Sequence, residues 1–177
     1  MNSIKMTLNS LGVGGIQLGA SIDTVTPMAP FNSDDRKLYL PDPGPEVWFR
    51  YLGDITEIKG AEGGIFSARS VYFSMGNDRM INRIVIHPDT THDKPIEDIL
   101  KATYGPGWVS SGGMGNLGGV NTYTMYLYNS RDKRSQICYT KTTSSDFGID
   151  EIIFNLVADA QNVLNYKLVF RSWAQTE

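Results

Sequence analysis

Apolar and polar residues alternate through much of the chain, which is the pattern of strands with one buried face. Segments of this kind, bounded by turn-forming residues, lie at 47–52, 65–74, 80–86, 121–128, 135–141 and 165–173. Residues 75–78, Met-Gly-Asn-Asp, separate the second segment from the third and predict an antiparallel pair joined by a turn. The pattern as a whole therefore predicts a largely antiparallel sheet.

The apolar spacing changes to that of a helix after residue 93. Ile96, Ile99 and Leu100 recur at the intervals of one helical face. The pair Gly-Pro at 105–106 ends the pattern, because glycine suits a helix stop and proline cannot continue it. We predict a helix over about 94–104.

A shorter helix is predicted after Ser21, whose side chain can accept a hydrogen bond from a free amide of the first turn. Asp23 complements the positive end of this helix, and Pro27 stops it. The proline-rich stretch 28–46 that follows predicts an extended connector.

Residues 149–163 fit two patterns. Their apolar residues follow a helical stripe from Ile149 to Ala160. However, 149–154 also resembles 81–86, because both have an isoleucine, two polar residues and three apolar residues after a turn-prone stretch. The density of Ile, Phe and Val favours a strand. We predict a strand here, although the periodicity alone predicts a helix.

The similarity of 81–86 to 149–154 predicts that one structural unit is used twice. The first unit would span about 14–88 and the second about 93–173, within a single domain of 177 residues. Each unit would contain one helix and several antiparallel strands. The predicted fold is therefore α+β, with one sheet system and the helices packed on one face.

Composition limits the classes of function. Hydrophobic residues make up 41% of the chain and charged residues 20%, which is typical of a globular domain. A net charge of −3 gives no basic surface for nucleic acid. No apolar run approaches the ~20 residues of a membrane-spanning helix, and the first residues lack a secretory signal pattern. We expect a cytoplasmic protein if Met1 is the native start, and otherwise a periplasmic or secreted mature form.

Motifs for known chemistry are sparse. Residues 113–118 match the G-x-G-x-x-G of dinucleotide-binding proteins, but they follow a predicted helix and precede a strand, which is the wrong context. We therefore interpret 110–119 as a flexible loop that could become ordered on a partner. The single Cys138 excludes an internal disulfide and fits a buried strand position. No cofactor is predicted.

His87 and His92 are the two histidines of the chain, and Asp93 follows the second. A catalytic zinc site needs three protein ligands on rigid elements, so we expect no metal site here. We expect solvated loop histidines, or one of them helping to cap the helix at 94–104. An enzyme that uses these residues in a pocket between the two units, such as a hydrolase, is the alternative hypothesis. A carrier of a small ligand between helix and sheet is another.

Aromatic and arginine residues supply the candidate binding surface. Strand alternation places Tyr123, Met125 and Leu127 on one face, and Tyr126 and Tyr128 on the other. We assign the first face to the core and the second to a partner, since Tyr, Trp and Arg dominate protein interfaces. The alternative is that these aromatic residues cap sheet edges or lie under long loops at the rim of the core. The predicted partner-binding residues are all of these types: Trp48, Arg50, Trp108, Tyr126, Tyr128, Arg171 and Trp173.

Residues 16–25, Ile-Gln-Leu-Gly-Ala-Ser-Ile-Asp-Thr-Val, resemble the I-x-hydrophobic-G-x-S/T-x-x-x-V helix opening of small bacterial SmpA/OmlA-like and beta-lactamase-inhibitor-protein-like domains. Residues 96–105 are similar to a later helix of such modules. The chain lacks the cysteines of the inhibitor proteins, and its second helix lacks the Gly-x-S/T opening. The resemblance implies a tandem, non-catalytic fold that presents a sheet face or loops to another protein.

We therefore expect a protein-binding domain of the inhibitor or immunity type. Its partner would be another protein, such as a toxin or an enzyme, and not a nucleic acid. A rigid sheet would carry the aromatic residues, and the segment 110–119 would adapt to the partner.

Overall fold

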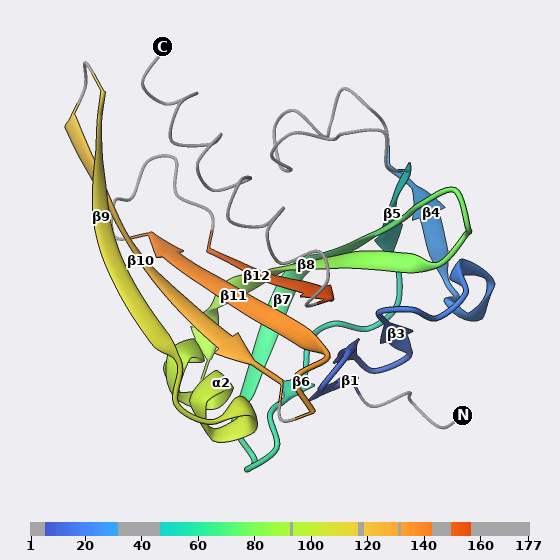
Figure 1. Ribbon diagram of the computed structural model, residues 1–177, viewed down its shortest axis with the longest axis horizontal. Helices are drawn as coiled ribbons and strands as arrows, with labels where there is room; N and C mark the ends of the chain where they lie inside the picture. The colour runs from blue at the N-terminus through green and yellow to red at the C-terminus, as the bar shows by residue number, and fades with distance from the viewer. Residues whose placement is uncertain are drawn as a thin grey trace.

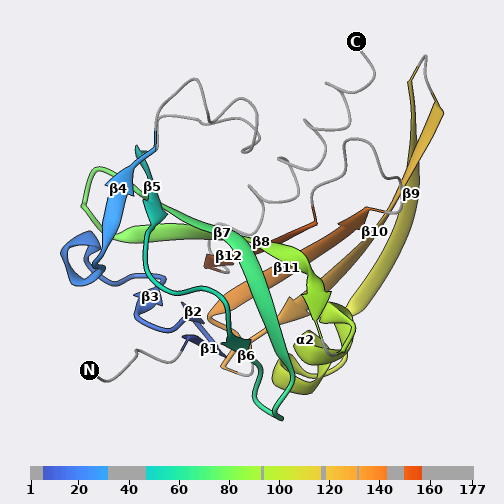
Figure 2. The same ribbon diagram turned by 180° about the vertical axis from the view of Figure 1, so that it is seen from behind.

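The computed structural model describes residues 6–31, 47–92, 94–116, 119–130, 132–142 and 150–156 (Figures 1 and 2). Within them, twelve strands form one large mixed sheet, and the one α-helix is α2. The first strands are β1 (Met6–Asn9), β2 (Gly12–Val13), β3 (Ile16–Gln17), β4 (Met28–Pro30), β5 (Val47–Tyr51), β6 (Ile58–Lys59) and β7 (Ile65–Met75). The later elements are β8 (Ile81–His92), α2 (Ile96–Tyr104), β9 (Trp108–Asn116), β10 (Gly119–Asn129), β11 (Ser135–Thr142) and β12 (Glu151–Leu156).

The sheet is centred on β7, β8, β12 and β11. The strand order is β3-β2-β1-β6-β7-β8-β12-β11-β10-β9, and β5 branches from β7 with β4 beside it. In the described residues, only β1 and β6 pair in parallel. The predicted antiparallel pair of 65–74 with 80–86 is confirmed as β7 and β8.

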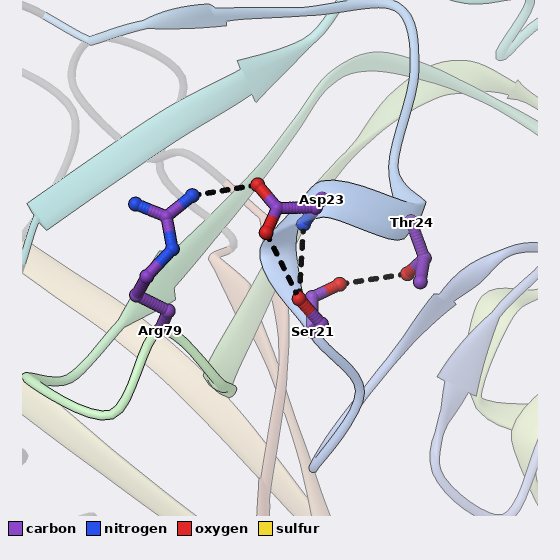
Figure 3. A network of polar contacts seen from close by, with 4 residues as sticks. All are labelled: Ser21, Asp23, Thr24 and Arg79. Carbon is purple, nitrogen blue, oxygen red and sulfur yellow. Dashed lines mark hydrogen bonds and ion pairs between the residues drawn. The ribbon is translucent and has the colours of Figure 1, made fainter.

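This architecture contradicts the predicted α+β fold with helices packed on one face, because strands dominate and the expected first helix is missing. After Ser21 the chain forms only the 3-10 turn η1 (Ile22–Thr24). The predicted cap is present, since the amide of Asp23 donates to Ser21 Oγ at 3.3 Å (Figure 3). Arg79 binds the Asp23 carboxylate at 2.6 Å, so this turn is held against the β7–β8 connection. Pro27 follows too closely for a longer helix to form.

The central strands are buried on both faces, which explains why their sequences are apolar without strict alternation. The larger core lies on the side of α2, and we call this side the helix face; it includes Phe73, Ile84 and Ile152. A smaller cluster covers the other side of the same strands, which we call the opposite face. Its members are Phe31, Trp48, Tyr72, Val85 and Ile153.

α2 packs closely against the helix face. Its buried residues Ile96, Ile99 and Leu100 belong to the larger core, as their spacing predicts. Gly60 and Gly64 allow this approach, because a Cβ atom on either glycine would lie 2.6 Å from a side-chain atom of Ile99. The predicted helix is confirmed, with its start at residue 96.

β12 confirms the strand prediction for residues 151–156. This strand is buried on both faces, so that Ile152, Ile153 and Phe154 are consecutive core residues and show no strict alternation. β12 pairs with β8, which means that the two similar segments of the sequence are direct neighbours in the sheet. Residues 157–163 and the predicted closing strand at 165–173 lie outside the described residues.

The pairing registers relate two groups of strands by a local two-fold axis. Residues 84–86 of β8 pair with residues 152–154 of β12 in opposite order, which places the axis between Val85 and Ile153. On one side of the axis the strands follow in the order β8, β7, β5 and β4. On the other side the equivalent strands are β12, β11, β10 and β9, in that order. The two-fold relation holds for the strands and not for the helical elements. The short turn η1 precedes β4, whereas the longer helix α2 precedes the equivalent strand β9.

Aromatic pairs repeat this symmetry. Phe49 on β5 lies opposite Phe73 on β7, with ring centroids 5.8 Å apart and an interplanar angle of 19°. Tyr126 on β10 lies opposite Tyr139 on β11 with the same separation and the same angle. The two strand groups can therefore be compared position by position.

Candidate functional site at the β9 edge

Three strands form the edges of the sheet in the described part of the chain: β3, β4 and β9. β3 has two residues, and β4 has three and ends in Pro30, which has no amide hydrogen to donate. β9 has nine residues. An edge strand exposes N–H and C=O groups that can pair with another strand, and short length or proline prevents this. Of these three edges, β9 is the one open to pairing.

β9 lacks proline, charged residues and bulges, which commonly protect an edge strand. Its sequence, Trp-Val-Ser-Ser-Gly-Gly-Met-Gly-Asn, contains no proline and no charged residue. Its register with β10 is continuous over its whole length, without a bulge. The hairpin of β9 and β10 projects beyond the rest of the sheet (Figures 1 and 2). The edge is therefore long and regular.

β9 also corrects the prediction of a flexible loop at 110–119. Residues 110–116 belong to β9, and Gly119 begins β10. The G-x-G-x-x-G match consequently falls on a hairpin and not on a strand-to-helix phosphate loop. Pairing with β10 supplies the hydrogen bonds that overcome the low strand propensity of glycine. Residues 117–118 lie outside the described residues.

Two large apolar side chains are exposed at the start of β9. Trp108 is 58% exposed and Val109 is 53% exposed. Trp108 pairs with Leu127, in a row that continues to Ile153, so Trp108 lies on the opposite face. Val109 pairs with Tyr126 and lies on the helix face. A strand added at this edge would therefore meet an apolar side chain on each face of the sheet.

Further inward from the edge, the helix face carries polar side chains that we call the tyrosine shelf: Tyr126, Tyr139, Glu97 and Lys141. Lys141 Nζ lies 3.0 Å from Glu97 Oε1, and these side chains are 40% and 20% exposed, respectively. Tyr139 donates a hydrogen bond to Asp150 Oδ2 at 3.2 Å. Glu97 Oε2 is buried and has no hydrogen-bond partner among the described residues. The shelf thus combines two stacked rings with one incompletely satisfied carboxylate.

The electrostatics of the shelf are acidic. Burial, followed by the charges of Glu97 and Asp98, raises the pKa of Tyr126. The hydrogen bond to Glu97 raises the pKa of Lys141, and the charge of Asp150 adds to this effect. Lys141 therefore stays charged. Within the described residues, three carboxylates, those of Glu97, Asp98 and Asp150, act on Tyr126 or Lys141, against the single positive charge of Lys141.

Of the predicted partner-binding residues, two are exposed and two cannot be placed. Trp108 is the most exposed large apolar side chain of the described residues. Arg50 is also exposed, and its guanidinium carbon lies 6.0 Å from the centre of the Tyr72 ring. Arg171 and Trp173 lie outside the described residues.

The structure turns the face of β10 that carries Tyr126 and Tyr128 toward the larger core. Tyr128 is 3% exposed within the larger core, and its hydroxyl donates to the backbone oxygen of Glu97 at 3.1 Å. Tyr126 lies on the same face and is partly buried. Trp48 is buried as well, in the smaller cluster. Alternation separates two faces but does not say which one α2 covers. The structure places Trp48 and Tyr128 in the core.

The alternative site of His87, His92 and Asp93 is not assembled in the described residues. His87 is a buried residue of β8 and not a solvated loop residue, and its Nδ1 lies 3.0 Å from Ser70 Oγ. His92 is exposed and pairs with Phe66, further along β8. Asp93 lies outside the described residues. Within these residues no three His, Cys, Asp or Glu side chains form a metal-binding group.

Sequence patterns do not identify the β9 edge, because strand order decides which strands are edges. The position of Glu97 beside Tyr126 depends likewise on how α2 packs across β10. The one available signal is the absence of charged residues from 108 to 116, which is unusual for an exposed segment. Val109 and Glu97 are therefore site residues that only the structure identifies.

The described residues contain no helix that is both long and apolar enough to cross a membrane. No protein-family model, curated protein or solved structure matches this chain. The basis for a function is accordingly the geometry of the β9 edge.

Proposed function

We propose that the protein binds another protein by strand addition at the β9 edge. The partner would supply an extended segment whose backbone pairs with β9, so that the sheet gains a strand. The observation that supports this proposal is a nine-residue edge without proline or charge. Trp108 and Val109, exposed at its start, would add apolar contact area on both faces.

Comparison with the symmetry-related edge supports the same proposal. Pro30 of β4 pairs with Phe49 as Val109 of β9 pairs with Tyr126, so Pro30 and Val109 occupy equivalent positions. One edge is short and closed by proline, whereas its counterpart is long and open. The strand arrangement itself does not require this difference, and selection for a partner at β9 accounts for it.

A protein-binding role agrees with the resemblance to SmpA/OmlA-like and beta-lactamase-inhibitor-protein-like domains. An inhibitor or immunity-type protein of this kind would hold a toxin or an enzyme against a rigid sheet. In this proposal the contact surface is the edge of the sheet, together with the side chains next to it. The net charge of −3 is too small to steer association strongly.

A library of random linear peptides displayed on phage tests the proposal without a known partner. Neighbouring residues of an edge strand direct their N–H groups alternately toward the sheet and away from it. We therefore expect one of two variants, Ser110→Pro or Ser111→Pro, to keep the wild-type melting temperature. That variant should bind the selected peptides about tenfold more weakly, because it lacks an outward donor. Biolayer interferometry measures the affinity.

The other variant of the pair is the matched control. Its proline removes an amide that bonds to β10, so its melting temperature should fall. The proposal is wrong if the wild-type protein enriches no peptide. It is equally wrong if the enriched peptides bind the stably folded proline variant with wild-type affinity.

A further inference from the structure

The tyrosine shelf lies inward of Val109 on the same row of the sheet. Val109 pairs with Tyr126, and Tyr126 pairs with Tyr139. A strand added to β9 would lie about 10 Å from β10, which is two strand spacings. A long side chain of the added strand, directed to the helix face at this row, would pass over Val109 and reach the Tyr126 ring.

We infer that the tyrosine shelf binds the cationic side chain, lysine or arginine, of the segment that adds to β9. The inference rests on the proposed function and specifies the chemistry of the partner. Glu97 Oε2 is a buried acceptor without a hydrogen-bond partner among the described residues. The Tyr126 ring adds a π surface, which attracts cations through its quadrupole.

The symmetry-related strands show that packing does not require the polar groups of the shelf. By register, three polar residues have apolar counterparts: Tyr126, Tyr139 and Lys141 correspond to Phe49, Phe73 and Met75. The rings stack with the same separation and angle in both places. Packing of the two rings therefore does not require these polar groups. Tyr139 is 1% exposed and its hydroxyl bonds to Asp150, so the groups open to a ligand are the Tyr126 ring and the Glu97 carboxylate.

The charge around the tyrosine shelf is mainly negative, which favours a cationic ligand. Glu97, Asp98 and Asp150 act on the shelf, and in the described part of the chain Lys141 is the one ammonium group that acts on Tyr126. Lys141 contacts one oxygen of Glu97, and the other has no donor among the described residues. A second charge-assisted hydrogen bond to this carboxylate would be stronger than a neutral one. An anionic side chain would instead be repelled.

Peptides selected on the wild-type protein test this inference. We expect them to carry a basic residue at a fixed position, and replacement of that residue by glutamine should lower their affinity about fivefold. On the Glu97→Gln variant the same replacement should have no effect. Lys141→Met should act in the opposite direction and raise the affinity for basic peptides, because it removes a competing ammonium group.

Titration with n-butylammonium chloride gives a second measurement, in which NMR follows the ring protons of Tyr126 and Tyr139. Saturable shifts with n-butylammonium but not with n-butanol, and their loss in Glu97→Gln, are the expected results. Equal shifts with n-butanol, or weaker binding of basic peptides to Lys141→Met, would overturn the inference. Failure to enrich any peptide contradicts strand addition itself, whereas enrichment of peptides without a fixed basic residue contradicts only the cation site.

Discussion

At the scale of single residues, His87 is a buried titratable group that packs against Tyr72 on the opposite face. It is 3% exposed, and its Nδ1 lies 3.0 Å from Ser70 Oγ. Burial lowers the pKa of His87 from its ordinary value of 6.5; the charge of Glu151 opposes this shift, and that of Arg69 adds to it. Nε2 is buried and has no hydrogen-bond partner in the described part of the chain. The imidazole is therefore neutral at neutral pH.

We predict that the free energy of unfolding decreases as the pH falls below about 6.5. The unfolded chain binds a proton at His87 in this range, while the folded protein binds it only at lower pH. The contribution of His87 is thus complete above the unfolded pKa and is lost as the pH falls toward the folded pKa. Urea denaturation at a series of pH values measures the slope.

His87→Gln should flatten this pH dependence, because glutamine has no group that titrates there. His92→Gln, at an exposed position of the same strand, is the matched control for the His-to-Gln substitution itself. Equal slopes in His87→Gln and the wild-type protein would assign the effect to other groups.

At the scale of elements, the sequence predicts α2 well and β9 not at all, for physical reasons. α2 is amphipathic and ends at a glycine followed by a proline, so its pattern is local. β9 has no apolar alternation beyond its first two residues, and it becomes a strand because β10 pairs with it. The same limit applies to the tyrosine shelf, whose parts come from α2, β10 and β11 and meet only in the folded chain.

The contact between α2 and the glycines next to β6 leads to a stability prediction. A Cβ atom at Gly60 would lie 2.6 Å from Ile99 Cγ2 and 2.9 Å from Thr103 Oγ1. Thr103 is fixed by its bond to the backbone oxygen of Ile99 at 2.7 Å, so it cannot easily move aside. We expect Gly60→Ala to lower the free energy of unfolding by about 1–3 kcal/mol, because α2 must shift away from the sheet.

Gly15→Ala is the matched control for this substitution. A Cβ atom at Gly15 meets nothing within 4 Å, so the change should stay within about 0.5 kcal/mol of the wild-type value. Urea denaturation followed by circular dichroism measures both. If Gly60→Ala were as stable as Gly15→Ala, the close packing of α2 against this glycine would be contradicted.

At the scale of the whole molecule, the similarity of 81–86 to 149–154 has a structural counterpart in the two-fold relation of β8 and β12. The sequence does not reveal that these segments pair with each other, because pairing over this separation leaves no local pattern. It also predicts a first helix that the fold replaces with η1, since capping residues mark a helix start but not its length. The central strands of the sheet are buried on both faces. Such strands do not alternate between apolar and polar residues, so the alternation pattern does not identify them.

The centre of the two-fold relation is a packed pair whose contribution can be measured. Val85 and Ile153 are opposite each other and both belong to the smaller cluster. We expect Ile153→Ala to lower the free energy of unfolding by about 2–5 kcal/mol. Combined with Val85→Ala, the two changes should deviate from additivity by at least about 0.5 kcal/mol, since they share one contact.

Leu8→Ala is the control for this cycle, because β1 is separated from β12 by three strands and Leu8 belongs to the other cluster. Its effect should add to that of Ile153→Ala within about 0.5 kcal/mol. Denaturant unfolding of the single and double variants provides the values. Strict additivity of Val85→Ala and Ile153→Ala would show that the two sides of the axis are energetically independent.

The unequal edges of the sheet also limit the size of any assembly. Because β3 and β4 are too short to continue a hydrogen-bond ladder, the described part of the sheet has a single receptive border. Each chain can therefore pair directly with one guest strand, at β9. Two copies that met through β9 would form a closed dimer, since neither has a second long edge strand among its described residues.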